Sequence, residues 1–301
     1  MKERSVVNVA VATLWTTPQS PRKRDEEILS DPVDMEKWIA PQDYESLLEL
    51  CDRNLIQSQL LFGTEVNVVG IEGDWSEVVV AEQPSSKCAD GYPGWIPSSQ
   101  LSKDERKVPK DGYAIVNVPF TELEYENGRM KLSYLTALPV INQTEEAVRV
   151  QTPKGPGTLQ VDDIVFSSRT IPDVQGDGAA IVKDGEQFLD LPYLWGGMSA
   201  FGYDCSGFSY NMCRANGVII PRDANDQALH GKKVPLDALA PGDLLFFAYE
   251  KGKGAVHHVG IYHGDGVMIH SPKTGKTIET LSLKGTYYEE ELCEARRYWK
   301  D

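Results

Sequence analysis

The fold class follows first from residues 203–217, which read YDCSGFSYNMCRANG. Asp204 is a suitable N-cap and Gly217 a suitable stop, so the pattern predicts a helix over residues 204–216. Cys205 then lies in the first turn of that helix, where unpaired backbone N–H groups and the helix dipole favour a thiolate. Since an ordinary thiol, with a pKa of about 8.5, is mostly protonated at neutral pH, this position suits a cysteine nucleophile.

The alternative interpretation of any cysteine is a small buried residue. We assign that role to the four cysteines without a chemical neighbourhood: Cys51, Cys88, Cys213 and Cys293. Five scattered cysteines with no C-x-x-C pair do not predict a disulfide framework. They favour a reducing compartment instead.

A base for the thiol is predicted by residues 257–270, HHVGIYHGDGVMIH, which hold four of the five histidines. Alternating apolar residues predict a β-hairpin with one wholly apolar face. We pair Ile261 with Val267. This register places His258 directly opposite His270 on the other face, where Cβ atoms are about 4.5–5.5 Å apart. Two imidazoles held in this way can act as a base and its orienting partner.

The remaining residues of the hairpin fit the same interpretation. Gly260 leaves room that a larger side chain would take from the two imidazole rings. We treat the other histidines as structural or exposed: His230, His257 and His263.

A metal site is the competing interpretation of the histidine cluster. Cys205, His258 and His270 are three candidate zinc ligands, but no H-E-x-x-H or C-x-x-C spacing occurs. Ser206 is a weaker nucleophile candidate, because Asp204 stands where a G-x-S-x-G motif has its first glycine. We therefore predict a thiol–imidazole site with no metal and no cofactor, and keep zinc as the minor alternative.

Pattern changes divide the chain into three predicted domains: residues 1–105, 106–170 and 171–301. The first combines short strands with two expected helices, and the second is a run of short strands separated by turn signals, which is typical of a small barrel. The third mixes helices and strands. The predicted fold class is α+β, with two small β-barrels before a larger domain.

The sequence pattern predicts three long, uninterrupted strands in the first two domains. Alternation of Val7, Val9 and Val11 predicts one continuous first strand. In the second domain we expect single strands over residues 132–139 and 158–166.

The composition restricts the function. Thirty basic and 45 acidic side chains among 301 residues give a net charge of -15. Such a chain suits neither sequence-independent nucleic-acid binding nor an anionic membrane surface. The apolar part near the start is short and is interrupted by Asn8, so it does not predict a signal peptide. We expect a cytoplasmic protein, or a secreted or wall-associated one if a leader precedes this chain.

Residues 190–301 resemble the NlpC/P60 cysteine peptidases, bacterial relatives of the papain-like fold that cut peptidoglycan stem peptides. Six blocks occur in the family's order: PYLWGG (192–197), DCSG (204–207), PR (221–222), PGDL (241–244), HVGIY (258–262) and IH (269–270). The resemblance implies Cys205 as nucleophile, His258 as base and His270 as the orienting residue. The spacing argument reaches the same three residues separately.

The earlier part of the chain carries a second resemblance. Residues 72–80, EGDWSEVVV, and residues 91–97, GYPGWIP, resemble a bacterial SH3 domain, and residues 106–170 do so in pattern alone. With SH3-like modules before the peptidase, the whole chain resembles the γ-D-glutamyl-L-diamino acid endopeptidases of the dipeptidyl-peptidase VI and YkfC type. That resemblance implies release of L-Ala-γ-D-Glu from stem peptides with a free amino terminus, in murein peptide recycling.

The resemblance also implies how a substrate is held. The tetrahedral oxyanion needs donors, for which the backbone N–H of Cys205 and the hydroxyl of Tyr193 are candidates. Trp195 is assigned to the same pocket. For both aromatic residues, a place in the hydrophobic core is the competing interpretation.

Recognition of the free N-terminal ammonium of the peptide requires an acidic group. The resemblance to this group of endopeptidases implies Asp223, which occupies the position that they use for it. Asp204 and Ser206 are also assigned to the substrate pocket, although helix capping accounts for Asp204 by itself. Tyr92 is predicted to form a wall of the pocket, which would make the N-terminal domain a gate for short, free-ended peptides.

Two other functions remain open from the sequence. The same Cys-His-His site fits hydrolysis of another cell-wall amide bond. A non-catalytic wall-binding or muropeptide-binding module is disfavoured by the presence of all three catalytic residue types. Whether the diamino acid is lysine or diaminopimelate, and the oligomeric state, are left open.

Overall fold

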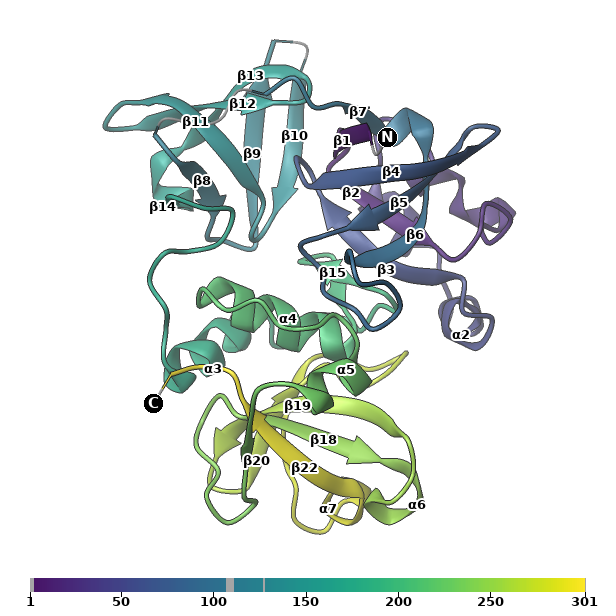
Figure 1. Cartoon of the computed structure of the whole chain (residues 1–301), viewed down its shortest axis with the longest axis vertical. Helices are drawn as coiled ribbons and strands as arrows, with labels where there is room; N and C mark the ends of the chain where they lie inside the picture. Colours follow the sequence, from purple (N-terminus) through teal and green to yellow (C-terminus); the bar gives the residue numbers. More distant parts are fainter. Residues whose placement is uncertain (1–2, 107–110, 127, 301) are drawn as a thin grey trace. The chain divides into compact units, whose positions relative to one another are not determined.

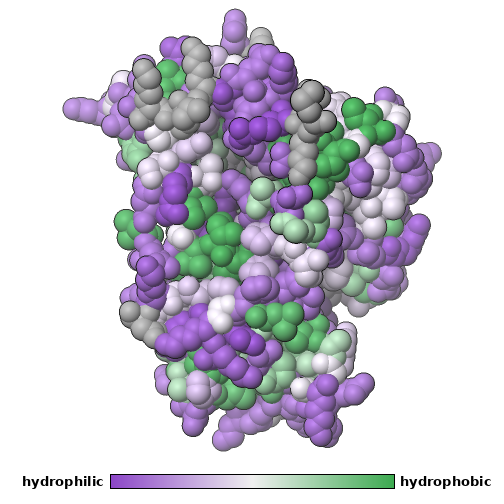
Figure 2. Space-filling model, in the orientation of Figure 1, coloured by the Kyte–Doolittle hydropathy of each residue, from purple (hydrophilic) through white to green (hydrophobic). Residues whose placement is uncertain are grey.

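The computed structural model describes residues 3–106, 111–126 and 128–300 of the chain (Figure 1). They form two compact units. The first comprises the residues up to Ala81, Asp90–Asp173 and Ser199–Phe201. The second comprises Glu82–Ala89, Val174–Met198 and the residues from Gly202 onward. Hydrophilic side chains cover much of the face seen in Figure 2.

The first unit contains two seven-stranded sheets. The strands of the first sheet pair in the order β3-β2-β6-β5-β4-β1-β7. Their bounds are β1 (Glu3–Val7), β2 (Val11–Trp15), β3 (Ile56–Leu61), β4 (Glu65–Glu72), β5 (Trp75–Val80), β6 (Tyr92–Pro97) and β7 (Leu101–Lys103). The helical segments beside it are η1 (Lys23–Ile28), α1 (Met35–Ile39), α2 (Tyr44–Asp52) and η2 (Ser98–Gln100).

The prediction of one continuous first strand is wrong. β1 pairs with β4 and β7, whereas β2 pairs with β3 and β6, so the chain changes partners between them. Val7, Val9 and Val11 are all fully buried, which explains the alternation that suggested a single strand. Strand pairing across the sheet decides the break, and that information is absent from the local pattern.

The strands of the second sheet pair in the order β10-β9-β13-β12-β11-β8-β14. Their bounds are β8 (Tyr113–Val116), β9 (Phe120–Tyr125), β10 (Gly128–Ser133), β11 (Ala137–Gln143), β12 (Ala147–Thr152), β13 (Gly155–Gln160) and β14 (Ile164–Ser167). Both long strands expected here are wrong. Leu135, with a φ of 65°, separates β10 from β11, and the helical turn η3 (Val161–Asp163) separates β13 from β14.

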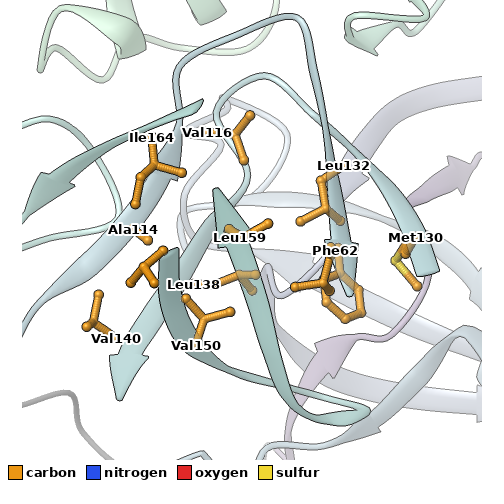
Figure 3. Close-up of a cluster of buried hydrophobic side chains, with 12 residues drawn as sticks. Phe62, Ala114, Val116, Met130, Leu132, Leu138, Val140, Val150, Leu159 and Ile164 are labelled. Atoms are coloured by element: carbon orange, nitrogen blue, oxygen red, sulfur yellow. The ribbon is translucent and has the colours of Figure 1, made fainter. Parts of the chain in front are cut away.

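Phe62 joins the two sheets of the first unit. It follows β3 of the first sheet in the chain, yet its side chain lies in the hydrophobic core of the second sheet, among Leu132, Leu138 and Leu159 (Figure 3). Only 1% of Phe62 is exposed. The second sheet therefore depends on a residue supplied from outside its own strands.

The second unit is built on a six-stranded sheet with the order β17-β22-β18-β19-β20-β21. The strand bounds are β15 (Met198–Ser199), β16 (Gly202–Tyr203), β17 (Lys232–Val234), β18 (Leu244–Ala248), β19 (Val256–Gly264), β20 (Val267–His270), β21 (Glu279–Ser282) and β22 (Leu292–Arg297). The helices are α3 (Gly178–Glu186), α4 (Cys205–Ala215), α5 (Ala224–Leu229), α6 (Tyr249–Gly252) and α7 (Tyr287–Glu291). α3, α4 and α5 all pack against β19 (Figure 1).

The β19–β20 hairpin exists, but its predicted register is wrong. Ile261 faces Ile269 rather than Val267, a shift of two residues. The turn explains the shift: Asp265 and Gly266, with φ values of 50° and 73°, form a tight two-residue loop. A bulge at the end of β19 absorbs one more residue. A shift of two keeps every side chain on its predicted face, so the two catalytic candidates still share a face.

Among the described residues, no helix is both long enough and apolar enough to cross a bilayer.

Candidate active site

Cys205 is the first residue of α4, as the capping pattern predicts. The carboxylate of Asp204 caps the helix by accepting a hydrogen bond from the backbone N–H of Gly207 at 2.6 Å. Cys205 retains partial exposure although almost every later residue of α4 is buried. Its sulfur accepts a hydrogen bond from the backbone N–H of Val259 in β19. The thiol at the start of α4 therefore contacts β19, the first strand of the hairpin.

The surroundings of the Cys205 sulfur disfavour its thiolate form. Burial raises the pKa of Cys205 to about 12, and the nearby Asp204 carboxylate raises it further. The N–H groups of Val259 and Ser206 act in the opposite direction but are outweighed. The N–H of Ser206 at the helix start favours the thiolate, as the sequence predicts, but desolvation of the sulfur has the larger effect on the pKa of Cys205. The sulfur needs a base that removes its proton.

His258 and His270 are hydrogen-bonded to each other. Nε2 of His258 lies 2.8 Å from Nδ1 of His270, and the two rings meet edge to face. Both side chains are buried. Burial lowers the pKa of His270 to about 4 and holds the pKa of His258 well below its ordinary value. Both imidazoles are therefore neutral at pH 7, and His258 is able to accept a proton.

The glycine opposite His270 matters for packing. A Cβ placed at Gly260 would lie 2.8 Å from Sδ of Met268 and 3.3 Å from Cβ of His270. A side chain there would require the Met268 side chain to move and would press closely against His270. The atoms nearest to such a Cβ are the sulfur of Met268 and the Cβ of His270, so crowding of the two imidazole rings stays a prediction.

Tyr288 covers the histidine pair and was not identified from the sequence. Its ring centroid lies 5.3 Å from that of His258 and 5.2 Å from that of His270. Phe247 packs against both Tyr288 and His258. Burial raises the pKa of the Tyr288 phenol, and the nearby Cys205 also raises it. These aromatic rings exclude water from the base and so account for its low pKa.

A buried ion pair fixes the start of α4. Arg222, only 1% exposed, donates to Asp204 at 2.6 and 3.1 Å and to the hydroxyl of Ser206 at 2.8 Å. The capping role that the sequence favours for Asp204 is thus what the structure shows. The hydrogen bonds described for the side chains of Asp204 and Ser206 lie within the protein, and their contact with substrate stays a prediction. Arg222 belongs to a matched sequence block but carried no predicted role.

Asp223 follows Arg222 in the chain, and its carboxylate forms an ion pair with a lysine side chain. It precedes α5 without making a side-chain capping bond. Its Oδ2 lies 3.0 Å from Nζ of Lys87. Lys87 comes from Glu82–Ala89, the segment that separates β5 from β6 in the chain and belongs to the second unit. The backbone of this segment is anchored there: Pro84 accepts a hydrogen bond from the N–H of Arg222 at 3.0 Å.

Comparison with known proteins agrees with this geometry. Residues 190–297 match the NlpC/P60 family, residues 53–101 the bacterial dipeptidyl-peptidase Sh3 domain and residues 116–166 the YKFC SH3b2 domain. A γ-D-glutamyl-L-lysine dipeptidyl-peptidase of Bacillus subtilis is 47% identical over 97% of this chain and 98% of its own length. This chain belongs to the NlpC/P60 family. It is a cysteine peptidase with two SH3-type domains, as the sequence motifs predict.

Two further relatives support the assignment to NlpC/P60. A γ-D-glutamyl-L-lysine dipeptidyl-peptidase of Bacillus cereus is 39% identical over 98% of this chain and 91% of its own length. The crystal structure of an NlpC/P60 family protein from Bacillus cereus superposes with a TM-score of 0.95 at 37% identity, covering 99% of this chain and 100% of that one. The predicted α+β fold with two SH3-like barrels is confirmed.

The other residues predicted for the NlpC/P60 pocket have these positions. Tyr193 is buried, and its backbone N–H donates to the carbonyl of Lys276 at 2.9 Å. Trp195 is half-buried. Tyr92 lies in the hydrophobic core of the first sheet, with its hydroxyl 3.5 Å from the side-chain oxygen of Gln57. The contacts of these three residues with substrate stay predictions.

The zinc alternative finds no geometric support. Within the described ranges, no three His, Cys, Asp or Glu side chains are arranged to hold a metal ion. His258 and His270 each direct one ring nitrogen at the other. A metal held by both would have to break or avoid that hydrogen bond.

Proposed function

We propose that this enzyme hydrolyses the γ-D-glutamyl–L-diamino acid bond of peptidoglycan stem peptides that carry a free N-terminal L-alanine. The products would be L-Ala-γ-D-Glu and the diamino acid with whatever follows it. The observation that carries the proposal is the placement of a thiol, a neutral imidazole pair and an ammonium-binding carboxylate in one unit. The names of the relatives from Bacillus subtilis and Bacillus cereus support the choice of bond.

The first step transfers a proton from Cys205 to His258 as the sulfur attacks the γ-carbonyl carbon. Since Nε2 of His258 faces His270, Nδ1 is the ring nitrogen available to take the proton. The imidazolium that forms is stabilised by its Nε2–H donating to Nδ1 of His270. No thiolate has to exist beforehand, which fits the raised pKa of the Cys205 thiol.

The tetrahedral intermediate then breaks down. Its oxyanion is held by donors, for which the backbone N–H of Cys205 and the hydroxyl of Tyr193 remain our candidates. The C–N bond breaks as His258 returns its proton to the departing amine, leaving a thioester on Cys205. A water molecule deprotonated by His258 hydrolyses the thioester, releasing the acyl product and regenerating the thiol.

Asp223 is the candidate for recognising the substrate ammonium. Its side chain is 22% exposed and already binds the ammonium of Lys87, so both its charge and its environment suit such a group. A peptide with a free amino terminus would replace Lys87 as partner. An N-acylated peptide lacks the positive charge and would leave Asp223 paired with Lys87.

The test compares L-Ala-γ-D-Glu-L-Lys with its N-acetyl derivative in wild type, Asp223→Asn and the matched control Asp237→Asn, whose aspartate is exposed. We expect Asp223→Asn to raise KM for the free peptide by roughly 10- to 100-fold and to leave the acetylated peptide unchanged. Equal discrimination in all three proteins would contradict the assignment. A diaminopimelate peptide measured alongside identifies the preferred diamino acid.

A place in peptide recycling within the cytoplasm is part of the proposal. None of the five cysteines, all of which lie in the described ranges, forms a disulfide. Reduced cysteines are usual in a reducing compartment. The free amino terminus that we propose for the substrate is a property of peptides already removed from the glycan, so these two parts of the proposal agree with each other.

A further inference from the structure

The hydrogen bond between the two histidines restricts their protonation. For His258 to accept the Cys205 proton on Nδ1, its Nε2 must carry the other hydrogen and donate it to His270. Nδ1 of His270 must then be a bare acceptor. His270 must therefore be the neutral tautomer that carries its single proton on Nε2.

The opposite tautomer would disable the base. If His270 carried its proton on Nδ1, it would donate to Nε2 of His258, and His258 would hold its own proton on Nδ1. That nitrogen would then have no lone pair with which to receive the proton of Cys205. Catalysis thus requires a nearby hydrogen-bond acceptor that favours a proton on Nε2 of His270.

Nε2 of His270 faces one acidic side chain. This nitrogen is buried and makes no hydrogen bond in the described structure. Oε1 of Glu279 lies 3.7 Å from it. Glu279 is directly opposite His270 in the pairing of β20 with β21. The imidazole of His257 and the phenol of Tyr288 also lie near the pair, and Tyr288 in turn lies near Cys205 and Tyr287.

We infer that Glu279 is a positioning residue that accepts a hydrogen bond from Nε2–H of His270 and so selects the tautomer that His258 needs. The present distance is slightly too long for a direct hydrogen bond, and a small side-chain movement or one bridging water closes it. The side chain of Glu279 is 48% exposed, so it has room to move. The inference rests on the catalytic roles proposed above for Cys205 and His258.

The test uses Glu279→Leu, which has no acceptor, and Glu279→Gln, whose amide oxygen is one. The matched control is Glu186→Gln, because Glu186 pairs with the half-buried His263 at 2.9 Å, outside the site. In nitrogen-15 NMR spectra at pH 7, we expect wild type and Glu279→Gln to show His270 protonated on Nε2. Glu279→Leu should show a mixture of the two tautomers, and Glu186→Gln should match wild type.

Two rate measurements complete the test. Glu279→Leu should lower kcat by roughly 10-fold, the size typical of losing an orienting outer partner, with KM unchanged and with recovery in Glu279→Gln. The rate at which iodoacetamide alkylates Cys205, followed by mass spectrometry, should fall in parallel. Alkylation needs no peptide, so it separates this inference from the choice of substrate. An unchanged tautomer in Glu279→Leu, or an unchanged alkylation rate, would overturn the inference.

Discussion

Nε2 of His258 lies 2.8 Å from Nδ1 of His270, although the two residues are diagonal neighbours rather than directly opposite across the hairpin. Diagonal residues on one face of a sheet are about 7–8 Å apart, a span that two imidazoles can bridge. The hydrogen bond therefore depends on both ring orientations. In our proposal His270 acts through its acceptor nitrogen, and the following prediction tests that role.

His270→Ala should lower kcat by at least 100-fold, because the imidazolium on His258 loses the acceptor that stabilises it. His270→Asn should retain more activity, since its amide oxygen can accept the same hydrogen bond. Steady-state kinetics on the tripeptide measures both values. Equal losses in the two variants would show that the acceptor is not what His270 contributes.

The buried neutral histidines predict a dependence of stability on pH. The pKa of His270 is about 4 in the folded protein, below the ordinary value near 6.5, so between these values the unfolded chain binds more protons. Stability is therefore complete above about pH 6.5 and falls as the pH approaches 4. From pH 7.5 to pH 5, His270 should account for a loss of about 2 kcal/mol.

Urea denaturation at the two pH values measures this loss. His270→Asn removes the titrating group and serves as the control. Its stability should fall less than that of wild type over the same range. The same pH dependence in both proteins would assign the effect to other groups.

Lys87 competes with the substrate ammonium in our account. Lys87→Met should therefore lower KM for L-Ala-γ-D-Glu-L-Lys by about 2- to 5-fold, the contribution expected of a partly exposed ion pair. The control is Lys253→Met, which removes an exposed lysine elsewhere in the second unit. A higher KM in Lys87→Met would mean that Lys87 helps to form the pocket instead of occupying it.

Phe62→Ala should destabilise the first unit by about 3–5 kcal/mol, because it empties a fully buried position in the core of the second sheet. Phe166→Ala removes the same atoms from a residue that is 44% exposed and should cost much less. Thermal unfolding of both variants measures the difference. Similar losses would contradict the place of Phe62 in that core.

The sequence predicts those parts of the site that local rules determine. Capping by Asp204 is local, so the position of Cys205 at a helix start is correct. The two-residue period of a strand is also local, so His258 and His270 were assigned to the correct face. Their register was not predictable from alternation, because it depends on the tight turn at Asp265 and the adjacent bulge.

Residues brought in from other elements were missed. Arg222, Tyr288 and Glu279 reach the site from a loop, a short helix and an edge strand. Nothing in the local sequence marks Tyr288 or Glu279, and the block that contains Arg222 does not reveal its ion pair with Asp204. The raised pKa of Cys205 was not predicted, for a related reason. Helix position is visible in the sequence, whereas burial of the sulfur depends on tertiary packing.

The most direct test of the central claim is to look for the acyl group on Cys205. L-Ala-γ-D-Glu-L-Lys is mixed with the enzyme, quenched in acid within milliseconds and analysed by intact and peptide mass spectrometry. We predict a transient L-Ala-γ-D-Glu adduct on Cys205, absent in Cys205→Ala, which should also be inactive. Continued release of L-Ala-γ-D-Glu by Cys205→Ala, or an adduct on any other residue, would contradict the account.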